Sequence, residues 1–226
     1  MFYITGDMHG EQSRFYDLAY NHNETLWSHN DYLFICGDWG FLFFNNRSEN
    51  AFLDDLSSRP YTICFLDGNH ENFQALAEYP EELWNGGRIH RIRKNIIHLM
   101  RGQYYTIQGK TFFTMGGAYS IDRYRRKLNE SYWPEELPNN EEYKEAASNL
   151  KAHGFNVDYI LTHTAPREIM LRMGITPDAH DAELTGFLEW VYYETSFQHW
   201  FFGHLHRDQI ISENMSAVWF DLHELG

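Results

Sequence analysis

The sequence has few cysteines and no long apolar run, and each shortage excludes a class of protein. Only two of the 226 residues are cysteines, Cys36 and Cys64, and both fall inside apolar segments that indicate buried strands. Isolated thiols of this kind are typical of small core side chains in a reducing compartment, rather than of a disulfide or a zinc site. No segment reaches the roughly 18 consecutive apolar residues of a membrane span. We therefore expect neither a disulfide-stabilised protein nor a membrane-spanning one.

Basic residues are also scarce. The chain has 18 Lys and Arg against 32 Asp and Glu, which gives a formal net charge of −14 at pH 7. A surface of this sign repels the backbone of DNA and RNA, so extensive nucleic-acid binding is not expected. Met1 to Ile4 lead directly into a candidate motif without the basic start of a secretory signal. We therefore expect a cytoplasmic protein without a membrane partner.

Apolar and aromatic side chains, by contrast, are plentiful enough for a sizeable core. Hydrophobic residues make up 43% of the chain and aromatic residues 17%, which is typical of a globular protein. A length of 226 residues is within the range of one domain. Because the sequence also shows no internal repeat and no low-complexity linker, we expect a single domain over residues 1–226.

Short apolar segments followed by polar turn residues recur along the chain. The first three lie at residues 2–5, 32–36 and 61–66, with helical patterns between them. Asp7 and Asp38, which follow the first two, are 31 residues apart, as are Asp38 and Asn69. This spacing is about the length of one βαβ unit. Since such crossovers are right-handed, we expect all three side chains at one edge of a parallel sheet.

The middle of the chain has a different pattern. Residues 96–100, 104–107 and 111–115 alternate with turn residues and predict an antiparallel section of a second sheet. Residues 119–138 form a long irregular segment, which we interpret as lid-like because loops of this length are commonly lids or binding loops. Further predicted elements are a helix that begins at the capping residue Asn139, a helix over 184–191, strands over 157–161 and 199–202, and a closing hairpin of 209–212 with 217–222.

Five predicted strands end in side chains that can bind metal ions. A single histidine is more often a structural residue than a ligand, and Gly68-Asn69-His70 alone is an ordinary turn. Five strand ends of the same kind are harder to attribute to chance. In Asp-x-His and His-x-His both side chains point the same way from extended backbone, so one ion can accept both. The residues are Asp7 and His9, Asp38, Asn69 and His70, His163, and His204 and His206.

These strand ends, in this order, resemble the motifs of the calcineurin-like metallophosphoesterases. The motifs are Gly6-Asp7-Met8-His9-Gly10, Gly37-Asp38, Gly68-Asn69-His70-Glu71, Thr162-His163 and Gly203-His204-Leu205-His206. The resemblance implies an α/β fold, a four-layer α/β/β/α sandwich with two mixed sheets and a dinuclear metal site at the strand ends. It assigns Asp7, His9, Asp38 and His206 to one ion, and Asp38, Asn69, His163 and His204 to the other, with Asp38 as the bridge.

The resemblance also implies a chemistry. Two divalent ions about 3.5–4 Å apart would activate a bridging water to hydrolyse a phosphoester bond. Mixed oxygen and imidazole ligands suit Mn, Fe, Zn or Co, and we expect Mn to support activity in vitro. His70 is not among the implied ligands. The resemblance places it opposite the phosphoryl group, where it helps to protonate the leaving oxygen or stabilises charge; the alternative is a hydrogen-bonded structural histidine.

The sequence departs from the protein phosphatases of this superfamily at one place. Those enzymes follow Gly-Asp with two variable residues and then Asp-Arg, whereas this chain has Phe41 and Leu42 there. A carboxylate that would orient His70 and an arginine that would bind phosphate are therefore missing. Candidates for the cationic partner are Arg123, Arg125, Arg126, Arg167 and Arg207. We predict substrate contacts from Asn69, Arg123 and Arg207.

Residues 116–122 and 133–136 resemble a segment of small bacterial and phage members of the family. We expect the aromatic residues of segment 119–138 to contact an apolar or base-like leaving group. The predicted function is that of a phosphodiesterase or small-molecule phosphatase, with a small molecule or nucleotide favoured over a protein as substrate. The alternatives are a nuclease or a protein serine/threonine phosphatase of the same fold, and a metal-bound scaffold without catalysis.

Overall fold

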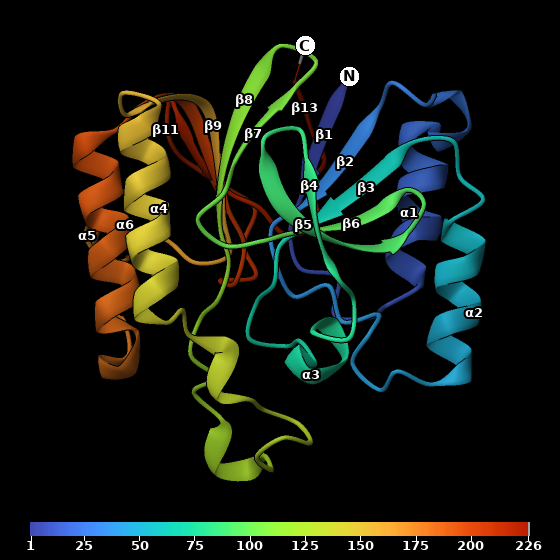
Figure 1. Cartoon of the computed structure of the whole chain (residues 1–226), viewed down its shortest axis with the longest axis horizontal. Coiled ribbons are helices and arrows are strands. Elements are labelled where there is room, and N and C mark those ends of the chain that lie inside the picture. Colours follow the sequence, from blue (N-terminus) through green and yellow to red (C-terminus); the bar gives the residue numbers. More distant parts are fainter. Residues whose placement is uncertain (226) are drawn as a thin grey trace.

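Two β-sheets lie face to face between two layers of helices (Figure 1). The computed structural model describes residues 1–225, except for the side chains of residues 19 and 20. Helices α1 and α2 cover the outer face of one sheet, and α4, α5 and α6 cover the outer face of the other. This arrangement confirms the predicted α/β/β/α sandwich. None of the described helices has the length and apolar character needed to cross a membrane.

The first sheet has seven strands and carries the first three predicted strand ends. Its central strands β1, β2, β3 and β6 are mutually parallel, and β13, β5 and β4 are antiparallel to their neighbours, so the sheet is mixed. In spatial order the strands are β13 (His223–Leu225), β1 (Phe2–Thr5), β2 (Tyr32–Ile35), β3 (Thr62–Phe65), β6 (Ile96–Leu99), β5 (Gly87–Arg93) and β4 (Glu81–Trp84).

The second sheet has six strands and carries the other two strand ends. Strands β8, β9, β10 and β12 are parallel, whereas β7 and β11 pair antiparallel at the two edges. In spatial order the strands are β11 (Gln209–Ser212), β12 (Met215–Ala217), β10 (Ser196–Phe202), β9 (Asn156–Thr162), β8 (Lys110–Met115) and β7 (Tyr104–Ile107).

Within the described residues, six α-helices connect or cover these strands. They are α1 (Ser13–His22), α2 (Arg47–Leu56), α3 (Phe73–Leu76), α4 (Asn140–Ala152), α5 (Arg167–Arg172) and α6 (Ala182–Glu194). The predicted cap of α4 is confirmed. The Asn139 side chain accepts hydrogen bonds from the N–H groups of Glu141 and Glu142, and the Glu142 carboxylate accepts one from the Asn139 N–H. This reciprocal pair satisfies helix-terminal donors and sets the start of the helix.

Three clusters of buried side chains form the core. The cluster between the sheets includes the stacked rings of Phe34 and Phe112, whose centroids are 4.8 Å apart. Both cysteines belong to it as free, buried thiols, which confirms their predicted place in the core. The other two clusters lie beneath the helical layers, around residues such as Leu53 on one side and Leu188 on the other. Each sheet is therefore buried on both faces, as the near-continuous apolar strands require.

Several predicted elements were wrong in place or extent. Segment 96–99 is a central strand of the first sheet, parallel to β3, and is not part of the second sheet. The hairpin of β4 and β5 and the short helix α5 were not predicted, and the closing hairpin uses Met215–Ala217 rather than 217–222. Alternation of apolar residues identifies a strand but does not say which sheet it joins. That choice depends on which long-range neighbours bury it.

Candidate metal centre

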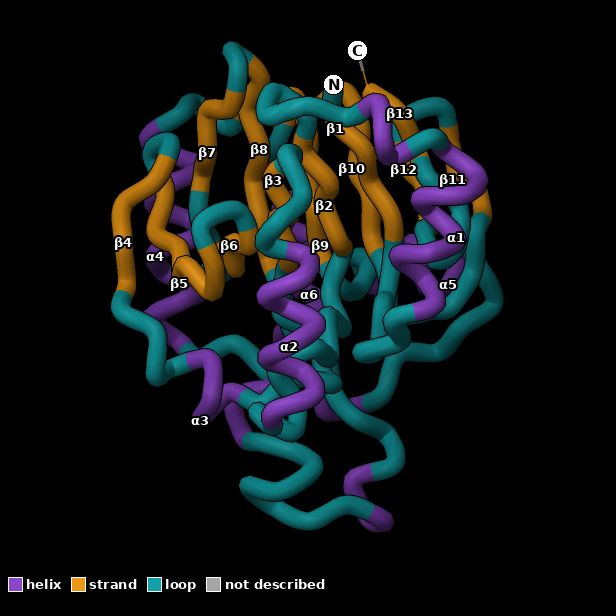
Figure 2. The backbone as a smooth tube through the Cα atoms, turned by 90° about the vertical axis from the view of Figure 1, so that its right-hand side faces the viewer, coloured by secondary structure: helices purple, strands orange, loops and turns teal. Residues whose placement is uncertain are grey.

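Five strands end at the same edge of the molecule. Strands β1, β2 and β3 run parallel in one sheet, and β9 and β10 run parallel in the other. The loops that follow them gather at the edge opposite the chain termini (Figure 2). This edge carries Asp7 and His9 after β1, Asp38 after β2, Asn69 and His70 after β3, His163 after β9, and His204 and His206 after β10.

Four of the predicted ligands form one tight group. Asp7, His9, Asp38 and His206 each offer an atom within 4.8 Å of the others. The Nε2 atoms of His9 and His206 are 2.8 Å apart, and His206 Nε2 is 3.1 Å from the Asp7 carboxylate. Nitrogen atoms this close must share a proton or face a cation. Two imidazoles beside two carboxylates therefore fit a divalent transition-metal ion.

The remaining predicted ligands meet around His163. Its Nε2 lies 3.1 Å from Asn69 Oδ1 and 3.4 Å from Asp38 Oδ1. Its ring packs edge-on against that of His204, with centroids 4.9 Å apart. His163 Nδ1 is 3.0 Å from the carbonyl oxygen of Cys36. That contact makes Nδ1 the donor, so Nε2 keeps its lone pair for the Asn69 and Asp38 side, as a ligand requires.

Asp38 lies between the two groups and is held ionised. Burial alone opposes its charge, but the imidazoles of His163, His70 and His9 outweigh burial and lower the pKa of Asp38 to about 2. The backbone N–H of His70 also donates to Asp38 Oδ1, at 2.8 Å. Burial lowers the pKa of His204 to about 4, which leaves that imidazole neutral at physiological pH. Ionised carboxylate and neutral imidazole are the forms in which these side chains bind metals.

The backbone at the site is strained. Asp38, His9, His204 and His206 have positive φ angles of 46°, 49°, 64° and 49°, a region that only a few per cent of non-glycine residues occupy, with Asp and His among the more frequent. Glycines beside these residues permit the close approach. A Cβ at Gly68 would collide with Asp38 and His163. Strain of this kind persists where the fold over-determines a functional conformation.

His70 faces an arginine from segment 119–138. Arg126 Nη2 is 3.0 Å from His70 Nε2, and Arg126 Nη1 is 3.3 Å from His70 Nδ1. A guanidinium only donates and a neutral imidazole has one acceptor nitrogen, so only one of these contacts is a hydrogen bond. Burial, reinforced by Arg126, lowers the pKa of His70 to about 4 although Asp38 opposes the shift. Arg126 thus brings a positive charge to the predicted catalytic histidine.

In the loop after β2, Phe41 and Leu42 stand where protein phosphatases of the superfamily have Asp-Arg, and both side chains point into the core. Both side chains are 1% exposed and belong to the core beneath α1 and α2. The buried Glu71 carboxylate accepts the backbone N–H of Trp39 at 2.6 Å and holds this loop in place. Burial and the nearby Asp38 raise the pKa of Glu71 well above its usual range. Glu71 was part of a sequence motif, but its supporting role was not predicted.

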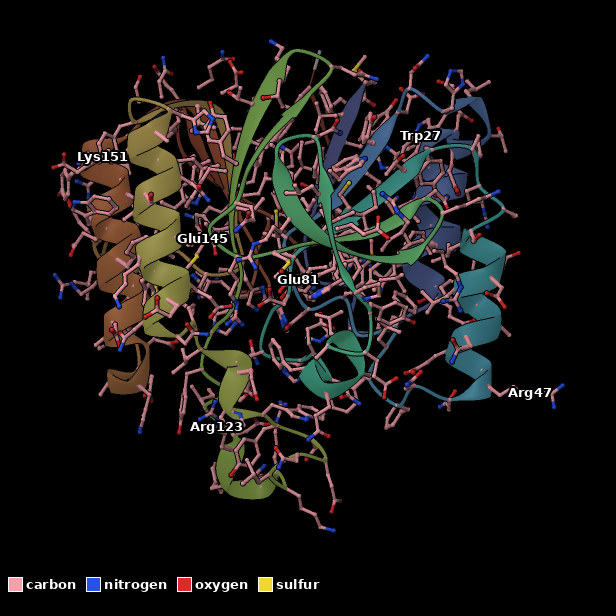
Figure 3. All side chains as sticks on the ribbon, viewed as in Figure 1. Trp27, Arg47, Glu81, Arg123, Glu145 and Lys151 are labelled. Carbon is pink, nitrogen blue, oxygen red and sulfur yellow. The ribbon has the colours of Figure 1, made fainter. Side chains whose placement is uncertain are left out.

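Arg123 has partners within its own segment. It forms an ion pair of 2.9 Å with the buried Glu136 and lies over the rings of Tyr119 and Tyr132. Figure 3 shows Arg123 in the part of the chain that projects beyond the sheets. Arg207 is exposed beside His206. The predicted substrate contacts of Asn69, Arg123 and Arg207 stay predictions, and Arg126 is the arginine that reaches His70.

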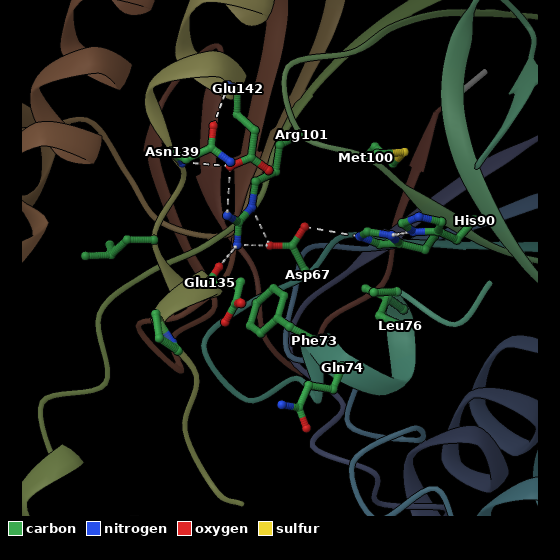
Figure 4. A pocket seen from close by; sticks show the side chains of 14 residues that line it. Asp67, Phe73, Gln74, Leu76, His90, Met100, Arg101, Glu135, Asn139 and Glu142 are labelled. Atoms are coloured by element: carbon green, nitrogen blue, oxygen red, sulfur yellow. Dashed lines mark hydrogen bonds and ion pairs between the residues drawn. The ribbon is translucent and has the colours of Figure 1, made fainter. Parts of the chain in front are cut away.

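Two cavities lie near this edge. One, of ≈ 330 Å³, is lined by His9, Gly10, Gly40, Phe43, Phe44, Glu49 and His70, so it opens directly onto the site. The other, of ≈ 460 Å³, surrounds the ion pair of Asp67 and Arg101 (Figure 4). It is the larger of the two, but its wall is made of other residues. The chemistry of the strand ends therefore belongs to the smaller cavity.

Comparisons with known proteins identify the family. A search of curated proteins found no match. Among solved structures, the chain matches one titled as the crystal structure of phosphopantetheinyl hydrolase from Mycobacterium tuberculosis, with 14% identity over 96% of this chain and 89% of that one and a TM-score of 0.41. That similarity is too low to support an argument. The family model for calcineurin-like phosphoesterases matches residues 1–208. Since the match covers nearly the whole chain, the protein belongs to the calcineurin-like phosphoesterase family.

Proposed function

We propose that this metal-dependent phosphoesterase acts on a small molecule or nucleotide, as a phosphodiesterase or small-molecule phosphatase. The observation that carries the proposal is the meeting of two donor groups at Asp38, with His70 and Arg126 beside them. Such a set can bind two cations and, next to them, the anionic oxygens of a phosphoester. The phosphoester substrate is the partner we propose. A cytoplasmic location is part of the proposal, because both cysteines are free thiols.

The donor set indicates how two metal ions would be held. Asp7, His9, Asp38 and His206 would hold one ion, and Asp38, Asn69, His163 and His204 the other. When bound, the two ions would supply Lewis acidity that activates water and neutralises phosphate charge. The family depends on a dinuclear centre. A mixed oxygen and imidazole set suits Mn, Fe, Zn and Co alike. We propose Mn as the ion that supports activity in vitro.

The chain's own residues orient the substrate and manage its charge. Arg126 can donate hydrogen bonds to a non-bridging phosphate oxygen, a role in which guanidinium is favoured. Neutral His70 keeps one ring N–H, which can donate to the departing oxygen and so stabilise the charge that develops there. A phosphate bound beside these two residues would raise the pKa of His70, because a nearby anion favours the protonated ring.

The substrate class follows from the surroundings of His70. Protein phosphatases of the superfamily have Asp-Arg where Phe41 and Leu42 are buried in this chain. Arg126 instead approaches from segment 119–138, and the cavity beside His70 has a volume of ≈ 330 Å³. Cavities of a few hundred Å³ suit small ligands. These observations favour a small phosphoester over a folded phosphoprotein.

A turnover assay tests the proposal. The Mn-loaded protein is assayed with p-nitrophenyl phosphate, bis-p-nitrophenyl phosphate, a phosphopeptide and single-stranded oligonucleotides, and then with a panel of metabolites and nucleotides. We expect turnover of the small esters and its loss in Asp38→Asn. The matched control Asp54→Asn, on the exposed face of α2, should behave as the wild type does.

The outcomes separate the alternatives. Preference for the diester supports a phosphodiesterase, and preference for the monoester supports a small-molecule phosphatase. A much higher kcat/KM for the phosphopeptide or the oligonucleotides overturns the proposal in favour of a protein phosphatase or a nuclease. Two bound ions per chain without turnover of any ester would identify a metal-bound scaffold.

A further inference from the structure

The cavity beside His70 has an aromatic wall. Phe43 and Phe44 line it together with Gly40 and Glu49, across from the imidazoles of His9 and His70. The Phe44 side chain is 73% exposed, so a large apolar ring faces solvent at the mouth of the candidate active site. Exposed apolar surface next to convergent polar groups is typical of a ligand site.

We propose that Phe43 and Phe44 form a subsite for an aromatic ring carried by the phosphoester substrate. This inference rests on the proposed function and names the substrate class, which is aryl or nucleobase-bearing phosphoesters. The ring would pack on the two phenyl groups, while the phosphate lies at His70 and the metal ligands. Offset or edge-on packing of aromatic rings adds about 0.5–1.5 kcal/mol to the burial of their area.

The backbone that carries the two rings is held by side-chain hydrogen bonds, and the Phe43 ring is also packed from behind. The Asn72 side chain donates to the Phe43 carbonyl at 2.9 Å. The Phe44 N–H donates to the Glu49 carboxylate, with both oxygens at 3.0 Å. The Phe43 ring packs edge-on against the buried ring of Trp133, with centroids 5.6 Å apart. A ligand that binds a preformed wall loses less conformational entropy on the protein side.

Segment 119–138 packs behind this wall and contributes none of the residues that line the cavity. The sequence predicted that its aromatic residues contact the leaving group. In the structure Trp133 is 1% exposed and lies behind Phe43, and Tyr119 and Tyr132 flank the Arg123 guanidinium. Tyr124 is the remaining candidate, since it is 77% exposed. Because Phe43 and Phe44 line the same cavity as His70, they are better placed for the ring.

The negative charge of Glu49 restricts which substrates fit the cavity. Glu49 lines the cavity at the phenylalanine end and is committed to the Phe44 N–H. Its negative charge disfavours a second anionic group at that end of the ligand. A compound whose ring end is uncharged therefore fits the cavity better than one that carries a second anionic group at that end.

Binding of non-hydrolysable analogues tests the subsite independently of turnover. Isothermal titration calorimetry compares phenylphosphonate with methylphosphonate on the Mn-loaded protein. We expect phenylphosphonate to bind wild type about tenfold more tightly, a ratio that corresponds to ~1.4 kcal/mol. In Phe44→Ala the ratio should fall to about two. The control Tyr193→Ala removes an exposed aromatic ring from α6, in the far helical layer, and should keep the wild-type ratio.

Three results would overturn the subsite. These are equal affinity of the two phosphonates for wild type, an unchanged ratio in Phe44→Ala, and a ratio that falls only in Tyr124→Ala, which would assign the ring to segment 119–138. The thermal midpoint of each variant confirms that it folds. If the protein hydrolyses esters but binds the two phosphonates equally, the subsite alone is rejected. If it binds phenylphosphonate tenfold more tightly but hydrolyses no ester, the proposed function alone is rejected.

Discussion

At the scale of single residues, Arg126 supplies the positive charge that the loop after β2 lacks. It comes from a part of the chain that carries no metal-binding motif, and its Nε atom pairs with Asp122 at 2.8 Å. That pair fixes the direction of the side chain, so the two Nη atoms point toward His70. A guanidinium placed in this way costs little rotamer entropy when it binds an anion.

Replacing Arg126 tests its role in binding phosphate. We expect Arg126→Ala to lower kcat/KM by about 10- to 100-fold, since a charge-assisted hydrogen bond contributes about 1.5–3 kcal/mol. Arg126→Lys should recover only part of the loss, because an ammonium cannot reproduce the fork of donors. The measurement is steady-state kinetics together with metal content. The matched control is Arg125→Ala, at the last residue of the 3₁₀ helix Arg123–Arg125 that Arg126 follows. An equal loss in both variants would indicate a merely structural effect.

A chain of buried and half-buried polar side chains leads away from the site. His98 Nε2 is 3.1 Å from Asp67, and His98 Nδ1 is 3.0 Å from His90 Nδ1. Arg101 lies next to Asp67 and, despite the burial of that carboxylate, helps to hold its pKa well below the usual range (Figure 4). Ionised Asp67 accepts from His98, which in turn accepts from His90. This order of donors leaves His98 Nδ1 without a proton and uses the Nδ1–H of His90.

The free energy of unfolding should depend on pH through His90. Burial and the adjacent His98 lower the pKa of His90 to about 4, with Arg88 acting in the same direction and Glu81 and Asp67 opposing it. Between pH 6.5 and 4 the unfolded chain takes up a proton at His90 that the folded chain does not. Stability therefore falls as pH falls through this window. Chemical denaturation at several pH values should show that the free energy of unfolding falls less steeply with pH in His90→Gln than in wild type. The exposed His29→Gln is the reference variant. Equal slopes for wild type and His90→Gln contradict the prediction.

At the scale of elements, segment 119–138 is tied to the candidate metal centre. The Ser120 hydroxyl accepts a hydrogen bond from Asn69 Nδ2 at 3.1 Å, and the Ser120 N–H donates to buried Glu136 at 3.1 Å. The first contact turns Asn69 Oδ1 toward His163. Ser120 is therefore a positioning residue for a predicted ligand, and the segment's lid-like role stays a prediction.

Removing the Ser120 hydroxyl should weaken one metal site. Loss of a side chain that orients a metal ligand typically lowers the affinity for the metal by 10- to 100-fold. We expect Ser120→Ala to lower the affinity for the Mn ion on the Asn69 side by about tenfold. The affinity for the ion on the Asp7 side should change little. Calorimetry and metal analysis measure both. Ser148→Ala, on the exposed face of α4, is the control. Unchanged affinity for both ions in Ser120→Ala would show that Asn69 needs no such support.

At the scale of the whole molecule, the candidate centre joins the two sheets. Asp7, Asp38 and Asn69 come from the first sheet, and His163, His204 and His206 from the second. Ions held between them would link parts of the chain that are otherwise joined through the apolar inter-sheet cluster. Binding to the folded state alone adds stability as RT ln(1 + [L]/Kd).

Metal loading should therefore raise the thermal midpoint. At about 100 times the Kd, a single site contributes ~2.7 kcal/mol, which corresponds to roughly 5–10 °C for a protein of this size. Differential scanning fluorimetry with Mn²⁺ and then with a chelator measures the rise and its reversal. Asp38→Asn should lose most of the shift because Asp38 serves both groups, whereas Asp54→Asn should retain it. An equal shift in both variants would place the bound ions elsewhere.

The sequence by itself determined the positions of the metal-competent side chains. Residue type, the 31-residue spacing and the end of each apolar segment are local features, and the structure brings together Asp7, Asp38, Asn69 and His163 as those features predicted. The parallel order of β1, β2 and β3 followed from the same repeat, because right-handed crossovers leave one arrangement.

Only the tertiary structure decided which distant side chains complete the site. The place of β6 in the first sheet, the approach of Arg126 to His70 and the aromatic wall of Phe43 and Phe44 were not predicted. Segment 119–138 has no periodicity that fixes its path. Its course is set by contacts with distant parts of the chain, such as Ser120 with Asn69 and Trp133 with Phe43. Such contacts form between residues far apart in the chain, so no local pattern encodes them.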